Sequence, residues 1–168
     1  MSREIFADLP GFSSTMTATK DSWKHEPFVD GRPVPYARQF SREQFASIKR
    51  GLVPETMEDK WFIYFDEHLF LHRSWSGEAV YRVSFVEHGE AVDVRDALIA
   101  GDELAKFGGR YEAEFLGFLI GNFLLGEDID FPRPASVRER IFGAFQHMLA
   151  GTGYRERRHD NGSEEPER

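Results

Sequence analysis

A corner of mixed chemistry closes the stretch MEDKWFIYFDEHLFLHRSWSG, residues 57–77. His72 and Arg73 precede Trp75 there, and Gly77 ends the segment. An imidazole, a guanidinium, an indole and serine hydroxyls placed this close together can stack a ring and hold an anion. An apolar core requires none of these groups at that position. The corner is therefore the first candidate for a ligand or partner site.

Two carboxylates, Glu58 and Asp59, stand near the start of the same stretch. If the site were catalytic, either of them could act as the general acid or base. Carboxylates at strand ends usually solvate turns instead. His68 and His72 stand four apart, yet no third ligand has suitable spacing, so we expect no metal and no other cofactor. The SWSG sequence also lacks the G-x-S-x-G nucleophile elbow. These observations favour a non-enzymatic protein.

The composition excludes several further classes. The chain has no cysteine, which rules out disulfides, thiolate zinc sites and cysteine nucleophiles. Its net charge of −8 disfavours binding to nucleic acid. The amino terminus carries charges where a signal peptide needs an apolar run, and the longest apolar stretch, 115–125, is too short to span a bilayer. We therefore expect a cytoplasmic protein that binds neither nucleic acid nor membrane.

The elements that position the corner are short strands. Aromatic and β-branched runs separated by turn residues predict an antiparallel meander of three to four strands. The predicted strands are 61–65, 69–73, 79–86 and 90–94. With a three-residue turn at 66–68, Trp61 opposes Arg73, close enough for a tryptophan–arginine stack. A two-residue turn at Asp66 and Glu67 would move every side chain of the second strand to the opposite face.

The three-residue turn assigns each side chain to a face, because strand side chains alternate. One face is almost wholly apolar and is expected to lie against the helices: Trp61, Ile63, Phe65, Leu69, Leu71, Tyr81 and Val83. The other face is mixed: Phe62, Tyr64, Phe70, His72, Val80, Arg82 and Ser84. Arg82 opposes Phe70 within reach of a cation–π contact. The mixed face suits either a ligand or a cover formed by the first 40 residues, and we favour the cover.

The rest of the chain predicts a single α+β domain, residues 1–152, in which the sheet packs on carboxy-terminal helices. Residues 1–40 are rich in loop formers, and 33–40 is typical of an edge strand. Four segments have helical spacing: 42–51, which has a capping box at Ser41 and Gln44, then 96–106, 111–125 and 137–150. Residues 153–168 are charged, which predicts a disordered tail.

The pairing of MEDKWFIY with HRSWSG resembles a small bacterial family with the pattern M-E-D-[KR]-W-F-x-Y … F-H-R-S-W-[ST]-G, loosely associated with proteins that process ADP-ribose. The likeness covers residues 57–77 well, although the turn at 66–68 lacks the glycine frequent in the family. It transfers no catalytic residue. It implies that the positions to test first are Glu58, Asp59, Trp61, His72, Arg73, Trp75 and Gly77.

We therefore expect a small binding protein whose meander and SWSG turn contact a partner or a small ligand. Two alternatives stay open. One is an enzyme or accessory module acting on ADP-ribose or a related nucleotide, with Arg73 or Arg82 meeting phosphate, an aromatic ring stacking adenine, and Glu58 or Asp59 as the acid–base group. The other is an acidic immunity-type protein that binds a basic toxin.

Overall fold

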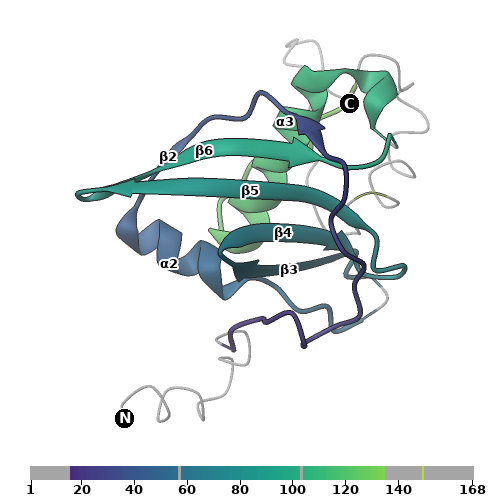
Figure 1. The fold of residues 1–168 in the computed structure, drawn as a ribbon, viewed down its shortest axis with the longest axis horizontal. Coiled ribbons are helices and arrows are strands. Elements are labelled where there is room, and N and C mark those ends of the chain that lie inside the picture. The colour runs from purple at the N-terminus through teal and green to yellow at the C-terminus, as the bar shows by residue number, and fades with distance from the viewer. Residues whose placement is uncertain (1–15, 57, 103, 135–148, 150–168) are drawn as a thin grey trace, which may run out of the picture.

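The computed structural model describes residues 16–56, 58–102, 104–134 and 149. They form an α+β fold in which helical segments cover one face of an antiparallel sheet, as the sequence predicts (Figure 1). The strands run in the order β1-β6-β5-β4-β3, and β2 also pairs with β6. Their bounds are β1 Arg32–Pro33, β2 Gln39–Ser41, β3 Trp61–Asp66, β4 His68–Arg73, β5 Ala79–His88 and β6 Ala91–Ile99. The helical segments are α2 Arg42–Arg50, η2 Ala105–Phe107, α3 Gly109–Phe118 and η3 Leu119–Leu124.

The hairpin between β3 and β4 has the register of the three-residue turn. Ile63 pairs with Leu71, and the pairing continues to Asp66 and His68 at the end of the hairpin. Glu67 alone lies between these two and has a φ of 66°. The two-residue alternative, which would have reversed the faces of β4, is wrong.

The predicted apolar face of the meander is buried. Trp61, Leu71 and the other predicted members belong to the main apolar cluster, with Phe65 packed partly buried against it. The ring of Trp61 lies 5.8 Å from that of Phe115 on α3, centroid to centroid. Helical segments α3 and η3 pass behind the sheet in Figure 1. The prediction that the helix at 111–125 docks on this face is confirmed.

The opposite face is covered by the segment that precedes β1. Phe62 and Tyr64 are buried together with Ala18, and Trp23 packs partly buried against them. In Figure 1 this purple segment runs from the β3 side of the sheet to the β6 side. The favoured interpretation of the mixed face, a cover from the loop-rich amino-terminal part, is confirmed for the described residues.

A β-bulge corrects one residue of the face assignment. Leu71 pairs with Tyr81, but His72 pairs with Ala79, so β5 has one extra residue at this point. The extra residue changes the alternation of side chains, and Val80 joins the main apolar cluster instead of the mixed face.

Helix α2 begins at the predicted capping box and ends at the predicted glycine. The Ser41 hydroxyl accepts from the Gln44 amide at 3.0 Å, while the Gln44 side chain accepts from the Ser41 amide at 2.9 Å. Gly51 has a φ of 68°, and a Cβ there would lie 2.2 Å from the carbonyl oxygen of Ile63. Leu52 then forms an isolated bridge to Ile63, with N···O distances of 2.8 and 2.9 Å in the two directions. Only glycine fits where the chain turns from α2 onto the edge of β3.

The predicted helix at 96–106 is wrong over most of its length, since among its described residues only Ala105 and Lys106 are helical, in the short segment η2. Residues up to Ile99 belong to strand β6. The fourth strand, predicted at 90–94, is therefore longer than predicted and has nine residues. Ala97 and Ile99 are buried in alternation and pair with β5, so ladder bonds and burial override the weak helical spacing. The predicted edge strand at 33–40 is two short strands, β1 and β2, at the two ends of β6.

The apolar helix predicted at 111–125 is confirmed as α3 followed by η3, which is π-helical. The predicted helix at 137–150 and the predicted tail at 153–168 lie outside the described residues, apart from the buried Leu149. Within the described ranges, no helix combines the length and the apolar character that crossing a bilayer requires.

Candidate functional site

Four of the eight sequence-predicted site residues lie at the connection between β4 and β5: His72, Arg73, Trp75 and Gly77. The amide of Arg73 donates to the Glu78 carbonyl at 2.8 Å, and the amide of Gly77 donates to the Arg73 carbonyl at 2.8 Å. Gly77 has a φ of 81°, and a Cβ there would lie 3.1 Å from the Cα of His25. Its carbonyl accepts from the Glu26 amide at 2.7 Å. The turn is therefore tight and is fixed against the segment that covers the mixed face.

His72 is buried beneath this turn, with 1% of its surface exposed. Its Nδ1 lies 3.1 Å from the Gly77 carbonyl oxygen. Since a carbonyl can only accept, Nδ1 carries the proton, and Nε2 is a buried acceptor without a hydrogen-bond partner among the described residues. The pKa of His72 is lowered from 6.5 to about 4, chiefly by burial; the hydrogen bond to Gly77 opposes this shift, and nearby His25 contributes to it. His72 is a neutral packing residue.

Arg73 is also buried, at 3% exposure. Its guanidinium carbon lies 4.8 Å from the centroid of Trp61, which confirms the predicted tryptophan–arginine stack. Its Nη1 donates to the Leu149 carbonyl at 3.2 Å, and Trp61 Nε1 donates to the same oxygen at 2.7 Å. In this position Arg73 joins the sheet to residue 149, and its guanidinium faces the protein interior.

The carboxylates at the start of the stretch shape a loop. Asp59 accepts from the amides of Glu55 and Thr56 at 2.9 and 3.1 Å, and its own carbonyl accepts from the Ser74 hydroxyl at 2.6 Å. The side chain of Glu58 is exposed, and its amide donates to Thr56 Oγ1 at 3.1 Å. Asp59 thus has the turn-solvating role that carboxylates at strand ends usually have.

Trp75 stands apart from its neighbours in the turn. It is 67% exposed, whereas Arg73, Ser74 and Gly77 are buried. Trp23 Nε1 donates to the Ser74 carbonyl at 2.7 Å and fixes the backbone directly before Trp75. The corner thus displays an indole on a turn whose flanking backbone, at Arg73, Ser74 and Gly77, is hydrogen-bonded.

Arg82 lies on the mixed face and opposes Phe70 across the strands, as predicted. Its guanidinium, however, lies over the ring of Phe28, with the carbon 5.7 Å from the centroid. The covering segment supplies this ring, which the pairing of strands alone does not predict. Arg82 Nε is buried and has no hydrogen-bond partner among the described residues.

The two histidines considered as a metal pair have separate surroundings. His68 Nδ1 lies 2.9 Å from the Ser84 hydroxyl, while His72 contacts Gly77. In the part of the chain that the structure describes, no three histidine, aspartate or glutamate side chains gather as a metal site would require.

Sequence reasoning missed the residues that the covering segment brings to the corner. The ring of His25 lies 5.3 Å from that of His72 and 5.4 Å from that of Tyr64. Trp23 holds the turn through Ser74. The only available signal was a tryptophan and a histidine in an otherwise polar loop, WKHEPF.

Comparison of the chain with protein-family models, with curated proteins and with solved structures gave no match.

Proposed function

We propose that the chain is a non-enzymatic binding protein that uses Trp75, on the β4–β5 turn, as its anchor in a protein partner. The exposure of this indole on a buried, hydrogen-bonded turn supports the proposal. Tryptophan is enriched among the interface residues that carry most of the binding energy. A turn that is already rigid loses little conformational entropy when a partner binds it.

Charge favours a basic partner. The chain carries a net charge of −8, and exposed Glu26 and Glu78 flank the turn on segments that hydrogen-bond to it. Opposite charges speed the encounter of two proteins and reject wrong partners. A basic protein with an apolar cleft for the indole is therefore the proposed partner, as an immunity-type protein that blocks a basic toxin would require.

Trp75→Ala is expected to weaken partner binding by about 30-fold or more, the size of an interface hot spot of about 2 kcal/mol. The variant should keep the free energy of unfolding within about 0.5 kcal/mol, because the indole is exposed. Wild type, Trp75→Ala and Val86→Ala would each be immobilised on a separate resin and exposed to a lysate of the source organism. Each protein retained by wild type would then be purified, and its dissociation constant measured for all three variants. Val86 is an exposed apolar residue on β5, away from the turn. A partner held equally by all three contradicts the proposal.

ADP-ribose is the second proposed ligand, and the resemblance at residues 57–77 implies it. Of the two arginines considered for the phosphate, Arg82 is the better candidate. Its Nε lacks a hydrogen-bond partner among the described residues, whereas the guanidinium of Arg73 faces the interior. Titration with ADP-ribose, NAD and AMP, followed by tryptophan fluorescence, should show a response that Arg82→Gln removes. The absence of a response at millimolar ligand contradicts a nucleotide site and leaves the protein partner.

A further inference from the structure

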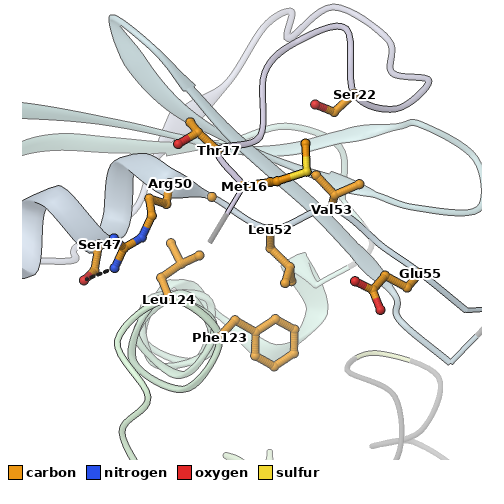
Figure 2. Close-up of a pocket in the computed structure, with 11 residues that line it drawn as sticks. Met16, Thr17, Ser22, Ser47, Arg50, Leu52, Val53, Glu55, Phe123 and Leu124 are labelled. Atoms are coloured by element: carbon orange, nitrogen blue, oxygen red, sulfur yellow. Dashed lines mark hydrogen bonds between the residues drawn. The ribbon is translucent and has the colours of Figure 1, made fainter. Parts of the chain in front are cut away.

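A hollow of about 500 Å³ lies between the carboxy-terminal end of α2, the loop that follows it, and η3 (Figure 2). Small-molecule sites in proteins measure about 300–1,000 Å³ and combine an apolar lining with a few polar groups. The hollow is separate from the β4–β5 turn, since none of the residues of that turn line it. We propose that it binds a small apolar monocarboxylate, with the carboxylate on Arg50.

The floor of the hollow is apolar. Leu52 and Val53 come from the loop after α2, and Phe123 and Leu124 come from η3. Leu52, Val53 and Phe123 are only partly buried, so they present surface to an occupant. Figure 2 shows Leu52, Phe123 and Leu124 together on one side, with Met16 across from them. These side chains would contact the apolar body of the ligand.

Two unusual backbone features border the hollow. Phe123 and Leu124 are the last residues of a six-residue π-helical segment, and π-helical turns inside helices occur frequently at functional sites. On the other side, Gly51 fits only without a side chain, because the Ile63 carbonyl approaches it. The backbone thus places the apolar residues of η3 on one side of the hollow and the end of α2 on the other.

Arg50 supplies the positive charge at one end. Its Nη2 lies 3.3 Å from the Ser47 hydroxyl, and it forms no ion pair with any residue that the structure describes. A planar guanidinium binds a carboxylate through two parallel hydrogen bonds. An exposed arginine that forms no ion pair with a described residue, at the rim of an apolar hollow, has the chemistry that a carboxylate head requires.

Glu55 limits the ligand to a single negative charge. In Figure 2 it lies on the far side of the floor from Arg50, with Leu52 and Phe123 between them. A second anionic group on the ligand would approach this carboxylate and be repelled. Phosphate esters and dicarboxylates are therefore disfavoured, and a ligand with one acidic head and an apolar tail fits best.

The test uses three probes of one length: octanoate, octan-1-ol and octylammonium, titrated into the full chain and followed by amide chemical shifts. Octanoate is expected to shift Leu52, Val53 and Phe123 and to bind at least tenfold more tightly than octanol. Arg50→Gln should remove this tenfold preference. Lys49→Gln is the matched control, because Lys49 is the neighbouring cation of the same helical turn but lies over the Phe45 ring, outside the hollow.

The proposal would be overturned by the absence of shifts at these residues with octanoate, by equal binding of octanoate by wild type and Arg50→Gln, or by tighter binding of octylammonium than of octanoate. Glu55→Gln should leave octanoate binding unchanged or strengthen it, and a loss in that variant also contradicts the proposal. Trp75→Ala should bind octanoate like wild type. The outcome is therefore independent of the partner proposed for the β4–β5 turn.

Discussion

Leu71→Ala is expected to lower the free energy of unfolding by about 2–5 kcal/mol, the usual cost of removing a large aliphatic side chain from a packed core. Leu71 is fully buried in the main apolar cluster, between Ile63 on β3 and Tyr81 on β5. The truncation leaves a cavity in the middle of the sheet, which rigid neighbouring strands cannot close. Urea unfolding followed by tryptophan fluorescence measures the loss.

Val86→Ala is the control for this measurement, since Val86 is a β-strand residue with 44% of its surface exposed. It should change the free energy of unfolding by no more than about 0.5 kcal/mol. Equal effects at Leu71 and Val86 would mean that the face of the meander described as buried does not carry the core.

Stability should fall as the pH is lowered from 6.5 to 4, and His72 should account for about 3 kcal/mol of the fall. Its pKa is lowered to about 4 in the folded chain by burial, against an ordinary 6.5. Between these values the unfolded chain takes up a proton that the folded chain refuses, so acid favours unfolding. Protonation would place an N–H at Nε2, where no described residue accepts it.

His72→Gln removes the titrating group and keeps a side chain that donates to the Gly77 carbonyl. The dependence of the unfolding free energy on pH between 6.5 and 4 should then become shallower by about 1.4 kcal/mol per pH unit. His25, whose ring lies 5.3 Å from that of His72, is present in both proteins. Identical slopes in wild type and variant would show that His72 titrates normally.

The sheet register was predictable because a single local feature determines it. Once the turn at 66–68 is taken as three residues, alternation assigns Ile63 and Leu71 to the buried face without further information. The capping box before α2 is equally local. By contrast, residues 96–99 resemble a helix in isolation, and only their pairing with β5 makes them a strand. Secondary structure that depends on a distant partner is not visible in local spacing.

The candidate site likewise has one part that local sequence predicts and another part that depends on distant residues. Trp75 could be placed at a turn from its serine and glycine neighbours. The burial of Arg73 could not be predicted in full, because one of its acceptors, the Leu149 carbonyl, lies 76 positions away. The hollow beside α2 was missed for the same reason: its lining comes from three parts of the chain, around residues 16–22, 47–55 and 123–124.

The bridge between Leu52 and Ile63 has a consequence for association between molecules. An exposed strand edge is a template onto which another chain can add, and uncovered edges lead to aggregation. Here the residue after Gly51 occupies the outward amide and carbonyl of Ile63 in β3, while β1 and β2 occupy the two ends of β6. Short pieces of the chain before the meander thus cover part of each border and oppose strand addition there. Trp75, with 67% of its surface exposed, lies on neither of these borders but on the β4–β5 turn.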